Sequence, residues 1–128
     1  GNGGVIFPEL HYGRDALVGI ALFLTYLANK KLKMSDLKSS FPQYTISKNK
    51  LDLTNSTNID LLLEKISNNY KNVKQNKIDG LKLEFENEWV HMRKSNTEPI
   101  IRIYAESKNE KSAHNLGERF VEELKSLI

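Results

Sequence analysis

A dense group of anion-binding side chains stands at residues 93–99, which read Arg-Lys-Ser-Asn-Thr-Glu-Pro. A phosphoryl group has three acceptor oxygens, and this segment offers a guanidinium fork, two hydroxyls, an amide and several backbone N–H donors. Charge-assisted hydrogen bonds contribute about 1.5–3 kcal/mol each, so three or four of them would hold a phosphate with about millimolar affinity or better. A simple polar turn has the same composition, and spacing alone does not decide between a phosphate cradle and such a turn.

Other groups of residues are weaker candidates for chemistry. The chain has no cysteine, which removes disulfides, thiolate zinc sites and cysteine nucleophiles. The three histidines have no metal-ligand spacing, and Glu84 and Glu86 fit a solvated strand edge better than an acid–base pair. We expect Arg102 to form a structural ion pair, and we expect the lysine-rich residues 71–77 to be the solvated end of a helix.

The composition is that of a soluble globular chain that can bury one ordinary core. Of its 128 residues, 39% are hydrophobic and 27% are charged, which excludes disorder of the whole chain. The formal charge of +3 permits nucleic-acid binding without indicating it. The longest apolar stretch, residues 16–28, is well below the ~20 residues needed to cross a bilayer. We therefore predict a buried helix there, with neither a membrane nor a nucleic acid as partner.

Residues 1–42 read as the tail of a domain whose body lies elsewhere. Residues 5–7 form a short apolar run that fits the end of a buried strand. Asp15 is placed to cap a helix over residues 15–29, whose apolar residues go nearly all the way round and call for cover on several sides. A short helical turn follows at residues 34–40, and Pro42 ends it. We place a domain boundary after Pro42.

Residues 43–128 alternate strands and helices in the order β-α-β-β-β-α. Apolar residues at helical spacing predict two amphipathic helices, which begin at capping boxes in residues 57–60 and 107–110. Strands are expected near residues 44–53, 81–86, 90–92 and 101–105, with a two-residue turn that sets Phe85 opposite Val90. The fold class predicted is α+β, an antiparallel sheet with helices packed on one face.

Two segments resemble motifs of the α-D-phosphohexomutase superfamily. Residues 93–102, Arg-Lys-Ser-Asn-Thr-Glu-Pro-Ile-Ile-Arg, resemble its C-terminal phosphate-binding loop, an arginine and one variable residue followed by Ser-Gly/Asn-Thr-Glu-Pro and a strand. Residues 1–6, Gly-Asn-Gly-Gly-Val-Ile, resemble the end of the sugar-binding loop in the preceding domain. The family carries a glutamate one residue upstream of that loop, and many members have serine where Asn2 stands and histidine where Gly4 stands.

The resemblance implies that the chain is the C-terminal quarter of a four-domain enzyme. Residues 43–128 would be a TATA-binding-protein-like phosphate-binding domain, and residues 1–42 the tail of the third, sugar-binding domain. Arg93, Ser95, Asn96 and Thr97 would bind the substrate phosphate that is not transferred. Asn2 and Gly4 would contact the sugar.

By the same resemblance, the phosphoserine and the Mg²⁺ loop lie in the N-terminal domains, which would be this chain's partners. No catalytic residue and no metal ligand is then expected among these 128 residues, and the chain alone would be inactive. The form of the sugar loop and residues 11–15 resemble phosphoglucosamine mutases most, with phosphomannomutase and phosphoglucomutase as alternatives. A cytoplasmic location is implied.

Two further hypotheses concern the chain by itself. It could be a stand-alone α+β module that binds an anion or a nucleic acid through its sheet, although the small net charge speaks against nucleic acid. The apolar helix over residues 15–29 could dock on a neighbouring domain or pair with a second copy in a homo-oligomer.

Overall fold

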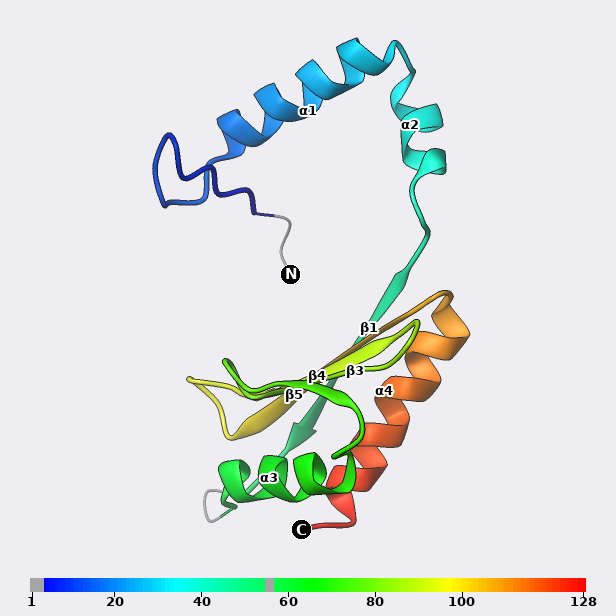
Figure 1. The fold of residues 1–128 in the computed structure, drawn as a ribbon. Coiled ribbons are helices and arrows are strands. Elements are labelled where there is room, and N and C mark those ends of the chain that lie inside the picture. The colour runs from blue at the N-terminus through cyan, green and yellow to red at the C-terminus, as the bar shows by residue number, and fades with distance from the viewer. Residues whose placement is uncertain (1–3, 55–56) are drawn as a thin grey trace. The chain divides into compact units, whose positions relative to one another are not determined.

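The fold comes from a computed structural model, which describes residues 4–54 and 57–128. The chain forms two compact units, Gly1–Pro42 and Gln43–Ile128. The first unit contains two helices, α1 (Ala16–Lys30) and α2 (Met34–Ser40) (Figure 1). The second unit contains a sheet and two further helices. Each unit is described by itself. Among the described residues, no helix is both long and apolar enough to span a membrane.

The first unit contains the predicted apolar helix. The carboxylate of Asp15 caps α1 by accepting a hydrogen bond from the Val18 N–H at 3.0 Å, and Lys31 ends the helix in the left-handed region with φ 53°. None of the residues of α1 is buried within this chain. Large apolar side chains are exposed all along it: Leu17, Ile20, Leu22, Phe23, Leu24 and Tyr26.

The predicted strand end at residues 5–7 is wrong. Residues 5–7 are exposed, and the one ladder contact there is an isolated bridge between Phe7 and His11. The Val5 carbonyl instead accepts a hydrogen bond from the Asp15 N–H at 3.0 Å. Since no neighbouring strand lies beside this run in the described part of the unit, its backbone bonds to the start of α1.

The second unit is an α+β domain, as predicted. Its elements are β1 (Thr45–Asp52), α3 (Ile59–Asn69), β2 (Lys74–Asn76), β3 (Leu81–Glu84), β4 (Trp89–Lys94), β5 (Ile100–Ser107) and α4 (Glu110–Lys125). The five strands are antiparallel in the order β1-β5-β4-β3-β2. Strand β2 replaces the expected helix end at residues 71–77: α3 stops at Asn69, and Lys74 pairs with Glu84 across β2 and β3.

One apolar core joins both helices to one face of the sheet. Alternate residues of β3, β4 and β5 point into it, and α3 and α4 cover it with their apolar sides. The largest side chains with essentially no exposure are Phe120, Ile66, Leu81, Leu83, Met92, Ile101, Ile103 and Leu124. The other face of the sheet carries the remaining alternate residues, and we call it the open face.

The hairpin of β3 and β4 has a different register from the one predicted. Leu83 lies opposite Val90, and the Phe85 N–H donates to the Glu88 carbonyl at 2.8 Å, so the turn residues are 86–87. The expected register, with Phe85 opposite Val90, was off by two residues. A shift of two keeps every side chain on its face, so the hydrophobic pattern fits both registers and could not separate them.

Both predicted capping boxes are wrong in the same way. The N-caps are Asn58, which accepts from the Leu61 N–H at 3.1 Å, and Asn109, which accepts from the Ser112 N–H at 2.9 Å. The expected cap Ser107 is still the last residue of β5, and its buried hydroxyl donates to a Glu88 carboxylate oxygen at 3.0 Å. Asparagine is as good a cap as serine, and here it stands where the chain turns.

The edge strand β1 is oriented by a close contact with α4. Its inward positions are the odd-numbered ones, including Ser47 and Asn49. A Cβ at Gly117 would lie 2.1 Å from the Asn49 Nδ2, so a larger residue there would have to displace the Asn49 side chain. This packing puts the even-numbered residues Lys48 and Lys50 on the open face.

Candidate phosphate-binding site

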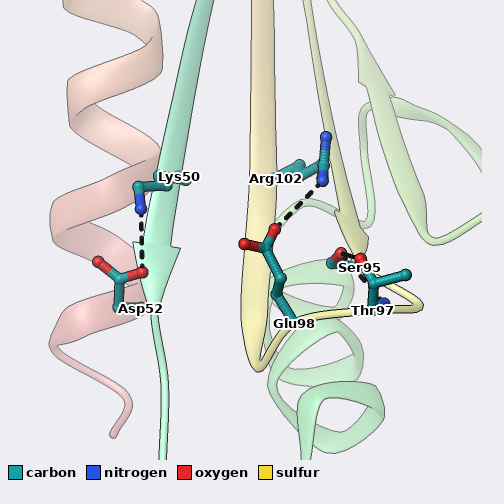
Figure 2. Close-up of polar contacts among 6 residues, drawn as sticks. All are labelled: Lys50, Asp52, Ser95, Thr97, Glu98 and Arg102. Atoms are coloured by element: carbon teal, nitrogen blue, oxygen red, sulfur yellow. Dashed lines mark hydrogen bonds and ion pairs between the residues drawn. The ribbon is translucent and has the colours of Figure 1, made fainter.

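The predicted loop, residues 95–99, connects β4 and β5. It closes tightly, because the Ser95 N–H donates to the Ile100 carbonyl at 3.0 Å and the Ile100 N–H donates to the Glu98 carbonyl at 2.8 Å. Figure 2 shows the loop at the end of the two strands, with the Glu98 side chain extended toward Arg102 on β5. Since β4 is the middle strand of the sheet, the loop is held by well-paired backbone on both sides.

The two hydroxyls of the loop face one another. Ser95 Oγ and Thr97 Oγ1 are 3.4 Å apart, and the Thr97 N–H points at Ser95 Oγ at 3.4 Å (Figure 2). Among the residues the structure describes, no protein group accepts a hydrogen bond from the backbone N–H of Asn96 or of Glu98. The loop therefore holds two adjacent hydroxyls and backbone donors without a protein partner, which are groups that can bind a small oxyanion.

The Arg93 side chain lies at the base of this loop and bonds outside it. It leaves β4 on the open face, and its Nη1 donates to Asp79 Oδ2 at 2.9 Å. Arg93 is 43% and Asp79 65% exposed, so this ion pair is open to solvent. Of the four predicted phosphate ligands, the structure brings Ser95 and Thr97 together, leaves Asn96 exposed beside them, and places Arg93 near them on an exchangeable carboxylate.

A glycine fixes the segment that holds Asp79 in place. Gly80 has φ +77°, and a Cβ there would lie 2.3 Å from the Met92 carbonyl oxygen and 2.9 Å from the Arg93 Cα. The turn therefore sits directly against β4. From β4, His91 Nε2 lies 2.6 Å from the carbonyl oxygen of Asp79. Arg93 and its acidic neighbour are thus set by backbone packing.

Arg102 also lies at the base of the loop beside Arg93, a position that was not predicted from the sequence. The predicted ion pair is present: its Nη2 lies 3.4 Å from a Glu98 carboxylate oxygen. Strand register also places Arg102 directly opposite Arg93 on the open face. The signal was available, because residues before and after a hairpin loop that share a face must be neighbours.

Away from the loop, the open face balances its charges. Glu84 lies between two lysines, with the Lys74 Nζ at 2.6 Å and the Lys82 Nζ at 3.2 Å, and hydrogen bonds from Lys74 and then Lys82 lower the pKa of the Glu84 carboxyl. Trp89 donates its indole N–H to Glu106 Oε1 at 2.8 Å.

The two predicted sugar contacts lie in the first unit. Asn2 is outside the described residues. Gly4 lines a hollow of about 780 Å³ with Arg14 and apolar residues of α1, and a Cβ at Gly4 would lie 2.8 Å from the Arg14 Cδ. Within the described residues, no three histidine or acidic side chains gather in a way that could hold a metal ion.

Comparison with known proteins gives a consistent result. Residues 53–123 match the family described as Phosphoglucomutase/phosphomannomutase, C-terminal domain. A phosphoglucosamine/phosphogalactosamine mutase of Sulfurisphaera tokodaii is 40% identical over 99% of this chain and 28% of its own length. A phosphomannomutase of Methanocaldococcus jannaschii is 30% identical over 95% of this chain and 26% of its own length.

A solved structure agrees with these matches. The crystal structure of a phosphoglucomutase/phosphomannomutase family protein from Burkholderia thailandensis has a TM-score of 0.71 and 25% sequence identity, over 97% of this chain and 26% of that one. The chain spans roughly a quarter of the length of these relatives.

Proposed function

Since this chain belongs to the phosphoglucomutase/phosphomannomutase family and contains its C-terminal domain, we propose that its loop binds the phosphate of a hexose phosphate that is not being transferred. The observation that carries the proposal is the pair of adjacent hydroxyls of Ser95 and Thr97 in this loop, with Arg93 and Arg102 opposite one another at its base. An oxyanion such as phosphate is the kind of ligand that can accept hydrogen bonds from all of these donors at once.

Binding would proceed by exchange of acidic partners. Arg93 and Arg102 each rest on an exposed carboxylate, of Asp79 and Glu98, and such pairs contribute about 1 kcal/mol or less. A phosphate can replace both carboxylates and add hydrogen bonds from Ser95 and Thr97. The guanidiniums then keep a negative partner throughout, so the loop needs no large rearrangement.

Holding one phosphate would supply the orientation part of catalysis. With the unreactive end of the sugar fixed, the opposite hydroxyl is confined near the group that exchanges phosphoryl with it. The phosphoserine and the Mg²⁺ that the family resemblance implies would be supplied by residues outside this chain, which is therefore expected to be inactive alone. A cytoplasmic location of the whole enzyme is a prediction from the same resemblance.

For the substrate, we propose glucosamine phosphate, interconverted between its 6- and 1-phosphates. The support is the sugar-loop sequence at residues 1–6 and the name of the Sulfurisphaera relative, a phosphoglucosamine/phosphogalactosamine mutase. Mannose and glucose phosphates are the alternatives, since other relatives are named phosphomannomutase or phosphoglucomutase/phosphomannomutase.

The first unit is proposed to be the tail of the sugar-binding domain, with Asn2 and Gly4 in its sugar loop. In that role α1 would be covered by the rest of its domain, which would explain why a helix so rich in apolar residues has none buried here. In the isolated chain, the same exposed residues are expected to make homo-oligomers.

A titration with glucosamine 6-phosphate, followed by amide NMR of the 128-residue chain, tests the anchoring role. We expect shifts at residues 93–98, which Arg93→Ala removes and the control Lys82→Ala, on the same face but away from the loop, leaves in place. If the amides between Arg93 and Glu98 do not move, the anchoring role is wrong. In the full-length enzyme, Arg93→Ala should raise KM and lower kcat.

A further inference from the structure

A row of three cations crosses the open face beside the loop. Strand register places Lys50 of β1 directly opposite Arg102 of β5, and Arg102 directly opposite Arg93 of β4. Like charges directly opposite one another destabilise a sheet. Neighbouring strands lie about 4.8 Å apart, so the whole row spans roughly 10 Å. Such a row costs stability unless an anion lies over it.

Each cation of the row now rests on an acidic residue that solvent reaches. Lys50 Nζ lies 3.3 Å from Asp52 Oδ1 on the same strand, and Arg102 Nη2 lies 3.4 Å from Glu98 Oε2 (Figure 2). Arg93 Nη1 lies 2.9 Å from Asp79 Oδ2. All three carboxylates are more than half exposed, at 76%, 57% and 65%. Pairs of this kind are weak and exchange readily. The three cations are therefore available to a stronger anion.

A hollow lies over the Lys50 end of the row. It measures about 240 Å³ and is lined from β1 by Lys48 and Lys50, from β5 by Arg102 and Tyr104, and from the loop by Glu98. The hollow thus adjoins the phosphate loop through Arg102 and Glu98, which belong to both. The next row of the sheet differs, because Lys48 stands opposite Tyr104, with its ammonium 5.9 Å from the centre of the ring.

We infer that Lys50 is a further phosphate-binding residue of this site, and that the row of Lys50, Arg102 and Arg93 makes the site select the dianion of a phosphate monoester. The inference rests on the proposed function. When the phosphate displaces Glu98 from Arg102, the Lys50 ammonium leaves Asp52 and takes a second oxygen of the same phosphate. Asp52 is then a competitor that weakens binding, and Lys48 takes no part.

The test uses glucose 6-phosphate, whose sugar is uncharged, with affinity measured by amide NMR on the 128-residue chain at pH 7.5. We expect Lys50→Gln to weaken binding about two- to fivefold, the effect of one exposed charge contact. The matched control Lys48→Gln, on the same strand and face, removes a charge that lies over the Tyr104 ring and should weaken binding clearly less than Lys50→Gln does. Lys50→Arg should restore most of the affinity.

Two more variants separate a direct contact from a general loss of charge. Asp52→Asn should strengthen binding, and it should have no effect when Lys50 is already glutamine, because its action passes through Lys50. The loss caused by Lys50→Gln should shrink at pH 5, where a phosphate monoester, with a second pKa of about 6, is mostly a monoanion. Unchanged Trp89 fluorescence shows that each variant is folded.

The outcomes distinguish this inference from the proposed function. If glucose 6-phosphate moves the amides of residues 93–98 and Lys50→Gln binds like Lys48→Gln, the role of Lys50 is refuted and the loop assignment stands. If the amides of residues 48–50 move and those of residues 93–98 do not, the loop assignment falls, and the shared site falls with it. If nothing moves in the parent chain, both are refuted.

Discussion

Helices α1 and α4 differ in burial, and the difference is the opposite of what their compositions suggest. In α1 most residues are apolar and none is buried within the chain, whereas α4 is largely polar and buries six residues, Phe120 among them. In α4 the apolar residues fall on one side, where the sheet and α3 meet them. In α1 they go round the helix, and the first unit holds little to cover them. Apolar content alone therefore says less about a core than the elements that surround a helix.

The largest difference is expected between a phenylalanine of α4 and a phenylalanine of α1. Phe120→Ala removes a fully buried ring from α4 and should lower the free energy of unfolding of the second unit by about 3–5 kcal/mol. Phe23→Ala, in α1, removes a ring that is 38% exposed and should leave that quantity unchanged. Urea denaturation followed by Trp89, the only tryptophan and part of the second unit, measures both. Equal losses would show that the units fold as one.

Two glycines give the next largest contrast. Gly80→Ala places a Cβ against the Met92 carbonyl at φ +77° and should cost more than about 1 kcal/mol. Gly19→Ala, inside α1, meets only the half-exposed Val5 side chain at 3.2 Å and should raise helix content, since alanine is favoured over glycine by about 1 kcal/mol. Urea midpoints and far-UV circular dichroism check the two. A neutral Gly80→Ala would refute the tight turn beneath Arg93.

A smaller difference is expected between two tyrosines. The Tyr70 hydroxyl donates to Glu123 Oε2 and accepts from Arg119 Nη2, both at 2.8 Å, and burial raises its pKa. Tyr70→Phe should destabilise the second unit by about 1 kcal/mol. Tyr26→Phe, in α1, alters a 43% exposed ring and should change the same urea midpoint by less. If the order were reversed, the Tyr70 bonds would contribute nothing net.

The smallest effect is a dependence on acid. Hydrogen bonds from Lys74 and Lys82 lower the pKa of Glu84, so its contribution to stability is present above the unfolded value of about 4.3 and is lost as the pH falls through the folded value. Glu84→Gln should flatten that part of the stability curve, measured by Trp89 fluorescence between pH 6 and pH 3.

The pKa of Asp15, the cap of α1, is lowered by the Val18 N–H and then by His11. Asp15→Asn, which keeps a capping oxygen, should flatten the acid loss of helical circular dichroism, with no effect on Trp89.

Most of the fold could be predicted from the sequence, because the second unit has clear periodicities. The helices around Ile66 and Phe120 and the strands around Leu83 and Ile103 follow directly from them. Strand β2 was missed because its three residues, Lys-Gln-Asn, carry no apolar alternation. It forms because Lys74 meets Glu84 across the ladder and Gln75 bonds backward to α3.

The loop of the candidate site could be predicted from the sequence, but the residues that neighbouring strands add to it could not. The residue types of the loop pointed to phosphate, and the register then placed Arg102 beside Arg93 and Lys50 beside Arg102. That placement needs the order of the strands, since Lys50 lies more than forty residues from Arg93 in the chain. A sequence read along its length carries no direct sign of such neighbours.

The position of the loop in the strand order has a consequence for how the molecule opens when heated. Strands β1 and β2 form the two edges of the sheet, and β4, which leads into the loop, lies in the middle. Edges fray first, so β1 should peel away while β4 and β5 still hold residues 95–99 in shape. Warming would then strip Lys50 from the sheet before the loop itself melts. Phosphate capture should fade by degrees with temperature, and the amide hydrogens flanking the loop should be among the last to exchange.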